Sequence, residues 1–164
     1  MAKVILLAED FDDDVAHLQM VFKKVGVANP VVIVHDGDEV VDYLEGKGAF
    51  TDRVRYPLPG ILLLDLNMPR MGGFEVLEWL QGHPNSKEIL VVVLTGNAGV
   101  WDMNRAYALG AHSFLVKPCH PEDLINLRKT FPEHWVEFTP TNGALVARKP
   151  ADGSVQNLGN AARC

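Results

Sequence analysis

The chain has 164 residues, of which 48% are hydrophobic and 22% are charged, and its formal net charge is −6. A chain of this length accommodates one domain, or one domain with an appendage. The hydrophobic fraction excludes wholesale disorder. The negative net charge argues against a nucleic-acid binder, because phosphate contacts need clustered lysine and arginine.

Membrane, export and disulfide signals are weak. No apolar run reaches the ~18 residues of a membrane span. Glu9 and Asp10 interrupt the apolar run after Lys3 before a signal-peptide core could form. Two cysteines, Cys119 and Cys164, give neither a disulfide framework nor a metal-ligand spacing. We therefore expect no membrane segment and a reducing, cytoplasmic location.

Short apolar runs alternate with helical patterns along most of the chain. The runs predict five strands, at Val4–Ala8, Val31–Val34, Ile61–Leu64, Ile89–Leu94 and Ser113–Val116. Amphipathic patterns predict the helices between and after them, at Asp14–Val25, from Asp38, at Phe74–Leu80, from about Ala98 to Leu109, and at Pro121–Phe131. Strands that are apolar throughout imply burial on both faces. The sequence therefore predicts an α/β fold with a doubly wound parallel sheet of five strands.

Two regions lack periodicity. Residues Lys47–Gly60 predict a loop that is long for a compact α/β domain, and such loops are often functional or mobile. Residues Thr139–Cys164 predict a tail. We therefore expect one domain over residues 1–131 and a C-terminal extension over residues 132–164.

The polar residues at the strand ends form a consistent chemical set. In an open parallel sheet, ligands bind at the carboxyl ends of the strands, which here carry Glu9, Asp10, Asp65, Thr95 and Lys117. Each pair of carboxylates at ~4 Å repels by about 4 kcal/mol at an effective dielectric near 20. Lys117 supplies one compensating charge, and Mg²⁺ suits an all-oxygen site. The set predicts a carboxylate that accepts a phosphoryl group in the presence of Mg²⁺.

Four sequence segments carry a family resemblance. They are "ILLAED", "LLLDLNMPRMGG", "VVVLTG" and "SFLVKP", in that order. From about Lys3 to Phe131 the chain resembles the receiver domain of bacterial two-component response regulators. The resemblance implies a CheY-like, flavodoxin-like sheet with the strand order 2-1-3-4-5. The long loop, "LLLDLNMP" and the aromatic-bearing C-terminal segment further resemble single-domain regulators associated with bacterial phytochromes.

The resemblance also implies roles for individual residues. Asp65 matches the phosphorylated aspartate. Asp10 and the carbonyl of Asn67 join Asp65 in binding Mg²⁺, and Glu9 acts mostly through water. The remaining acidic residues of this turn, Asp12, Asp13 and Asp14, are expected to cap the first helix or lie on its surface, with a minor role in contacts to metal-bound water.

A second set of matched positions concerns signalling. Thr95 matches the switch hydroxyl, and Lys117, before a typically cis Pro118, matches the lysine that contacts the phosphoryl group. Phe114 occupies the position of an aromatic that changes rotamer on activation. Asn97 lies at a position near the path of an attacking water, although a turn residue is equally consistent.

The resemblance implies a signalling phosphoacceptor rather than a classical enzyme. Its donor would be the phosphohistidine of a histidine kinase, and it would assist its own Mg²⁺-dependent phosphorylation and dephosphorylation. The alternatives are a receiver that binds partners without phosphorylation, and a phosphate sink or a shuttle in a phosphorelay. A flavodoxin-like carrier is disfavoured because the turn "EDFDDD" would repel a bare phosphate.

Large aromatic residues suggest an output surface. Trp101, Tyr107 and Phe114 lie on the predicted fourth helix and fifth strand, and Trp135 and Phe138 follow the last helix. Such side chains either fold back onto the domain or bury against a partner. We expect a homodimer through the fourth helix, fifth strand and fifth helix, with contacts from residues 132–138.

Overall fold

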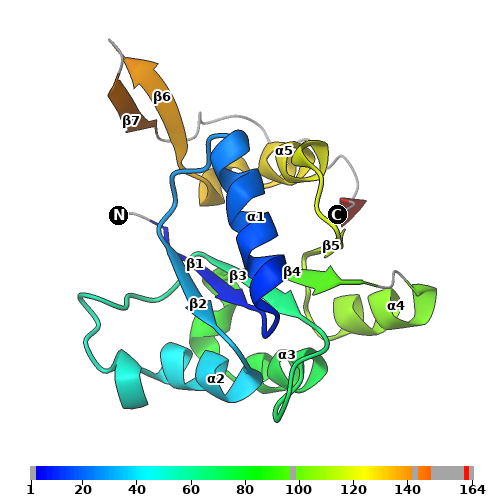
Figure 1. The fold of residues 1–164 in the computed structure, drawn as a ribbon. Coiled ribbons are helices and arrows are strands. Elements are labelled where there is room, and N and C mark those ends of the chain that lie inside the picture. The colour runs from blue at the N-terminus through cyan, green and yellow to red at the C-terminus, as the bar shows by residue number, and fades with distance from the viewer. Residues whose placement is uncertain (1–2, 97–98, 142–143, 149–160, 163–164) are drawn as a thin grey trace.

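The computed structural model describes residues 3–96, 99–141, 144–148 and 161–162. Its centre is a parallel sheet in which five strands follow the order β2-β1-β3-β4-β5 (Figure 1). These strands are β1 (Ile5–Ala8), β2 (Val31–Val34), β3 (Ile61–Asp65), β4 (Leu90–Thr95) and β5 (Ser113–Val116). The predicted doubly wound sheet and its strand order are confirmed. A two-residue strand, β8 (Ala161–Ala162), adds in parallel to the free edge of β5.

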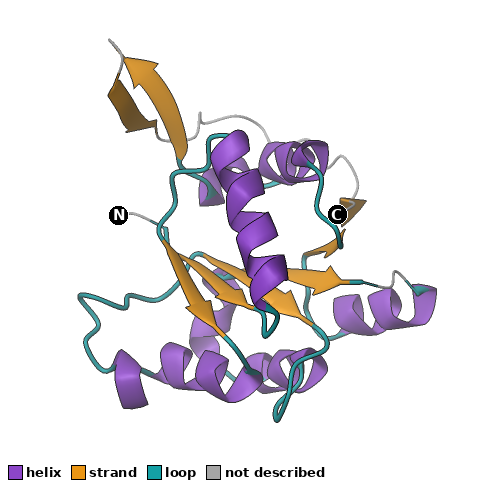
Figure 2. Ribbon diagram, in the orientation of Figure 1, coloured by secondary structure: helices purple, strands orange, loops and turns teal. Residues whose placement is uncertain are grey.

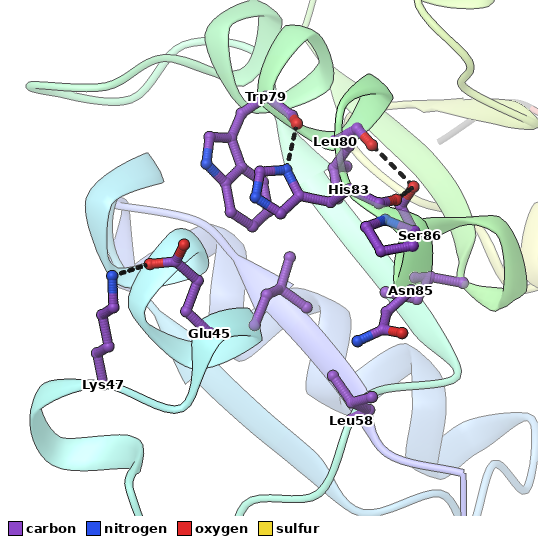
Figure 3. Close-up of a pocket in the computed structure, with 11 residues that line it drawn as sticks. Glu45, Lys47, Leu58, Trp79, Leu80, His83, Asn85 and Ser86 are labelled. Atoms are coloured by element: carbon purple, nitrogen blue, oxygen red, sulfur yellow. Dashed lines mark hydrogen bonds and ion pairs between the residues drawn. The ribbon is translucent and has the colours of Figure 1, made fainter.

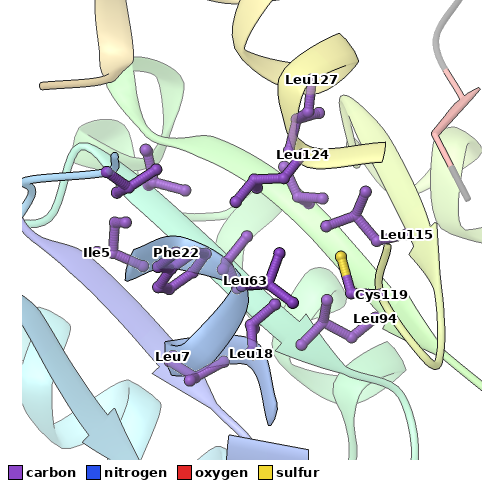
Figure 4. Close-up of a cluster of buried hydrophobic side chains, with 14 of the residues drawn as sticks. Ile5, Leu7, Leu18, Phe22, Leu63, Leu94, Leu115, Cys119, Leu124 and Leu127 are labelled. Atoms are coloured by element: carbon purple, nitrogen blue, oxygen red, sulfur yellow. The ribbon is translucent and has the colours of Figure 1, made fainter. Parts of the chain in front are cut away.

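Helices cover both faces of this sheet (Figure 2). One face carries α1 (Asp12–Lys24) and α5 (Pro121–Thr130), and the other carries α2 (Gly37–Glu45), α3 (Gly73–Gln81) and α4 (Val100–Ala108). Along β1, Ile5 and Leu7 pack into the core cluster under α1 and α5 (Figure 4). Leu6 and Ala8 pack into the cluster on the opposite face. Burial on both faces explains why the strands are apolar at every position.

The helix ends differ in detail from the prediction. The N-cap of α1 is Phe11, whose side chain makes no cap hydrogen bond, so the expected aspartate cap is wrong. The three aspartates instead occupy the first turn of α1, where their charges favour the positive end of the helix. No helix in the described ranges is long and apolar enough to cross a membrane.

The long segment between α2 and β3 is a loop, as predicted, with one turn of 3₁₀ helix, η1 (Gly48–Phe50). Side chains fasten it to α2. The hydroxyl of buried Tyr43 donates to the carbonyl of Pro57 at 2.9 Å, and Arg53 donates to the carbonyl of Tyr43 at 2.6 Å. The ring of Tyr56 packs edge-on against Tyr43, with 6.0 Å between centroids. The loop is therefore held against the domain by specific contacts.

The chain continues in an ordered path beyond residue 131. Trp135, 1% exposed, packs into the core cluster under α1 and α5. The side-chain amide of Asn29 donates to the carbonyls of Lys3 and His134, at 2.8 and 3.0 Å, and accepts from the Val136 N–H at 2.7 Å. The segment predicted as a tail also contains strands. They are an antiparallel pair, β6 (Glu137–Thr141) and β7 (Ala144–Arg148), together with the two-residue β8.

The burial of Trp135 generates a stability prediction. Trp135→Ala should lower the free energy of unfolding by about 3–5 kcal/mol, because it leaves a large cavity in the core. Met20→Ala is the matched control, since Met20 is 60% exposed on α1, and it should change stability by less than about 0.5 kcal/mol. Urea denaturation followed by circular dichroism measures both values. Equal effects would mean that the chain after residue 131 does not stabilise the domain.

Candidate functional site

Four neighbouring strands end at one edge of the sheet and bring the predicted polar residues together. Glu9 and Asp10 follow β1, Asp65 ends β3, Thr95 ends β4, and Lys117 follows β5. The strands are parallel and in register, so these five positions share one edge. The apolar runs that form the strands thus also determine where the polar residues meet.

Three carboxylates form the centre of the site. Carboxylate oxygens of Glu9, Asp10 and Asp65 all lie within 4.8 Å of one another. Glu9 and Asp65 are buried, whereas Asp10 is exposed. The N–H of Asn67 donates to Asp65 Oδ1 at 3.1 Å and keeps the start of the following loop beside the cluster. An all-oxygen donor set with one solvent-facing member fits Mg²⁺, which keeps several waters when it binds.

Lys117 is the cation that faces this cluster. Its ammonium lies 2.8 Å from Glu9 Oε2, 3.0 Å from Asp14 Oδ2 and 3.4 Å from Asp65 Oδ2. The side chain is mostly buried, so water screens these contacts only in part. Lys117 therefore offsets part of the repulsion among the carboxylates, as the sequence predicts.

The charges of the cluster shift the protonation of its members. Burial raises the pKa of Glu9 to about 7, with Asp65 adding to the rise and Lys117 opposing it. Burial alone would lower the pKa of Lys117, but Glu9, Asp65 and Asp14 outweigh this and raise it above its ordinary value. In the metal-free protein Lys117 is thus charged, and Glu9 is partly protonated near neutral pH. A bound cation would compete with that proton.

Asp14 is a member of the site that the sequence reasoning missed. It was expected to cap the helix or lie on its surface, yet its carboxylate contacts Lys117 directly. The helical period offered a signal. Asp14 lies one turn before buried Leu18 on α1, so both face the sheet.

Thr95 and Phe114 lie beside the cluster, toward α4. The carbonyl of buried Thr95 accepts a hydrogen bond from the Lys117 N–H at 2.7 Å. The half-buried ring of Phe114 meets Tyr107 edge-on, with 6.0 Å between centroids, and Phe114 and Thr95 line one small cavity under α4. A Cβ built on Gly96 would meet nothing within 4 Å, so there is open space next to Thr95.

Three further predicted positions, Asn97, Pro118 and Cys119, lie close in sequence to the residues of the site. The Lys117–Pro118 peptide bond is cis, as the resemblance implies. Asn97 lies outside the described residues. Cys119 is buried, and its carbonyl oxygen lies 2.8 Å from His17 Nε2.

A larger cavity lies away from these residues. It has a volume of about 390 Å³ and lies among α2, α3, and the 3₁₀ helix η2 (Pro84–Glu88), next to Ile89 before the start of β4 (Figure 3). Trp79 stacks on His83, whose Nδ1 lies 2.7 Å from the Trp79 carbonyl oxygen, and Lys47 pairs with Glu45 at 2.5 Å. These polar groups already bond to one another. The acidic cluster is therefore the better candidate for chemistry.

Comparison with known proteins gives one family. The model of the response regulator receiver domain matches residues 5–129. The response regulator Rcp1 of Synechocystis sp. is 33% identical over 135 residues, which covers 82% of this chain and 90% of Rcp1.

Solved structures give the same answer. The response regulator RPA3017 in red light signaling of R. palustris is 32% identical with a TM-score of 0.71, covering 88% of this chain and 98% of that one. The phosphorylated cyanobacterial phytochrome response regulator RcpA is 32% identical with a TM-score of 0.68, covering 82% and 94%. The Mn²⁺-bound form of Rcp1 is 34% identical with a TM-score of 0.65, covering 76% and 88%.

The contact between Asp14 and Lys117 generates a binding prediction. In the presence of Mg²⁺, Asp14→Asn should bind beryllofluoride, an analogue of a phosphoryl group, up to about five-fold more tightly, because a partly exposed ion pair that competes for Lys117 contributes at most about 1 kcal/mol. Asp13→Asn is the matched control, since it removes one exposed charge from the same helical turn. Equal gains in the two variants would mean that overall charge, and not the contact with Lys117, sets the affinity.

Proposed function

The chain belongs to the response regulator receiver domain family and is a phosphoacceptor of two-component signalling, and from this premise we propose that Asp65 receives the phosphoryl group. The burial and the contacts of the Asp65 carboxylate support this assignment. Asp65 is buried at the carboxyl end of β3, with Oδ1 held by the Asn67 N–H and Oδ2 facing Lys117. One oxygen is thus oriented, and a cation lies beside the other.

The surrounding residues would divide the work of phosphoryl transfer. An oxygen of Asp65 forms a bond to phosphorus as the bond between phosphorus and the donor nitrogen breaks. Lys117 neutralises negative charge on the phosphoryl oxygens. Asp10, Asp65 and the carbonyl of Asn67 would hold a divalent cation, with Glu9 acting mostly through water. When bound, Mg²⁺ neutralises charge on the phosphoryl and carboxylate oxygens.

The partner in this reaction would be a sensor histidine kinase. Its phosphohistidine supplies the phosphoryl group, and the histidine nitrogen leaves with the bonding electron pair. RPA3017 is described in red light signaling, and RcpA is described as a phytochrome response regulator. By similarity to these two proteins, we propose a phytochrome-type kinase as the donor.

Thr95 and Phe114 would change their contacts when Asp65 is phosphorylated. The Thr95 hydroxyl would donate a hydrogen bond to a phosphoryl oxygen, a contact that exists only in the phosphorylated state. A differential contact of this kind shifts the population between two conformations. Because Phe114 lines the same cavity as Thr95, its ring would move with that shift.

The output surface would be the face formed by α4, β5 and α5. Val100 and Trp101 are 69% and 71% exposed at the start of α4. We propose that this face mediates a homodimer across a two-fold axis, with α4 as its accessible part because β8 pairs with the edge of β5. Residues 1–131 would form the receiver domain, and residues 132–164 an extension. Trp135 is buried within its own chain, so it is not available as a dimer contact, and the side chain of Phe138 lies outside the described part.

The assignment of Asp65 predicts the loss of labelling. Asp65→Asn keeps the shape of the side chain but lacks the nucleophilic oxygen, so it should abolish the alkali-labile acyl phosphate that the wild type forms from acetyl phosphate in the presence of Mg²⁺. Radiolabelling measures the product, and Asp13→Asn should label like the wild type. Full labelling of Asp65→Asn would refute the assignment. An unlabelled wild type would favour a receiver that binds partners without phosphorylation.

The dimer proposal predicts a change in sedimentation. The full chain should form a dimer that beryllofluoride and Mg²⁺ strengthen, and Trp101→Ala should stay monomeric, because it removes the large exposed ring from the contact. Analytical ultracentrifugation of both proteins, with and without the analogue, measures this. Substitution is preferred to truncation after Thr130, which would empty the core position of Trp135. A wild type that is monomeric at tens of micromolar in both conditions would contradict the proposal.

A further inference from the structure

An ion pair joins the start of α2 to the loop that follows Asp65. The guanidinium of Arg70 contacts Asp36 Oδ2. The other oxygen, Asp36 Oδ1, accepts a hydrogen bond from the Glu39 N–H at 2.8 Å and caps α2. Asp36 is only 2% exposed, so both of its oxygens are fully used. Burial opposes ionisation of Asp36, but the Glu39 N–H and Arg70 outweigh it and keep its pKa below the ordinary value.

The backbone conformation of Arg70 requires contacts that hold residues 66–72 in place. Arg70 has a φ of 61°, the left-handed conformation that residues with a Cβ rarely adopt. Among the described residues it is the one non-glycine residue with a positive φ. Such a conformation persists only where the surrounding contacts enforce it. The ion pair to buried Asp36 is a contact of that kind.

A backbone contact secures the loop immediately next to this pair. The Gly37 N–H donates to the carbonyl of Met71 at 2.9 Å. A Cβ on Gly37 would lie 2.4 Å from that carbonyl oxygen, so no larger residue fits. At the far end of the loop, a Cβ on Gly73 would lie 2.5 Å from the carbonyl oxygen of Asp65. Close backbone contacts therefore hold residues 66–72 between α2 and the end of β3.

Asn67, the residue that contacts the acidic cluster, belongs to this loop. Asn67 lies three residues before Arg70, and its N–H donates to Asp65 Oδ1 at 3.1 Å. The conformation at Arg70 and Met71 therefore fixes the path of the main chain on which Asn67 depends. Groups that orient metal ligands typically change metal affinity by ten- to a hundred-fold when they are removed.

We propose that the Asp36–Arg70 ion pair is a positioning clamp that holds residues 66–72 in the conformation in which Asn67 meets the acidic cluster, and that it thereby sets the affinity of the site for a divalent cation. Neither residue touches the reacting atoms. The inference rests on the proposed function of the Asp65 site, because it takes the carbonyl of Asn67 as a ligand.

Three substitutions separate the charge of Arg70 from its backbone. Arg70→Gly removes the guanidinium and relieves the left-handed conformation, Arg70→Ala removes the guanidinium alone, and Arg70→Lys keeps a positive charge. Asp36→Asn keeps an oxygen for the Glu39 N–H while it removes the charge that Arg70 meets. Lys47→Ala is the matched control, because it breaks the exposed pair with Glu45 next to the distant cavity.

Two measurements on the full-length chain test the clamp. Calorimetric titration with Mg²⁺ should give a dissociation constant about ten-fold higher for Arg70→Ala, with Arg70→Gly and Arg70→Lys between this variant and the wild type. Hydrogen exchange of the amides of residues 67–71, measured without metal, should be faster in the same order. Combining Asp36→Asn with Arg70→Gly should add little to either single effect, because both remove one interaction. At saturating Mg²⁺ the phosphorylation rate of Arg70→Gly should return close to the wild-type value.

The outcomes distinguish this inference from the proposed function. Wild-type affinity for Mg²⁺ and wild-type exchange in Arg70→Gly and Arg70→Ala would overturn the clamp while leaving the Asp65 assignment intact. Additive effects in the double variant, or an equal loss in Lys47→Ala, would also overturn it. A wild type that binds no Mg²⁺ would instead refute the proposed metal site, and the exchange measurement would still show whether the pair holds the loop.

Discussion

The ammonium of Lys117 contacts the carboxylates of Glu9, Asp14 and Asp65 at the same time, and the site depends on this set of contacts. Glu9 and Asp65 lie buried at the carboxyl ends of the adjacent parallel strands β1 and β3, and two ionised carboxylates so placed repel each other strongly. The protein relieves this repulsion with the ammonium of Lys117 and with a Glu9 whose pKa is raised to about 7. A divalent cation would add further compensation. The carboxylates of the site thus carry more negative charge than Lys117 neutralises, which favours the binding of a divalent cation.

This balance explains how a small chemical change could alter the whole domain. A phosphoryl group on Asp65 would draw on the same ammonium that Glu9 and Asp14 now share. Lys117 is also tied through its N–H to the carbonyl of Thr95, at the end of the neighbouring strand. A change in the contacts of Lys117 is therefore felt at β4, next to the cavity that leads to α4.

Rigid support for the site comes from both faces of the sheet. The strands that carry Glu9 and Asp65 are buried between two hydrophobic clusters, which hold the strand ends in place. Loops have no such support and are fastened individually. The segment after α2 is fastened by Tyr43, and residues 66–72 by Gly37 and the Asp36–Arg70 pair. Asp65 thus lies where a rigid strand, β3, joins a loop that is held by its own contacts.

The sheet and the polar residues at its edge can be predicted from the order of residues along the chain. Continuous apolar runs identify strands that are buried on both faces, and a parallel sheet puts the residues after those strands at one edge. These two regularities predict that Glu9, Asp10, Asp65, Thr95 and Lys117 lie together. Three features depend on how the elements pack against one another: the contact of Lys117 with Asp14, the pairing of Asp36 with Arg70 and the burial of Trp135. Lys117 and Asp14 are 103 residues apart, and Asp36 and Arg70 are 34 apart. Periodicity reports only which face of its own element a residue occupies, so contacts between elements are fixed when the elements pack.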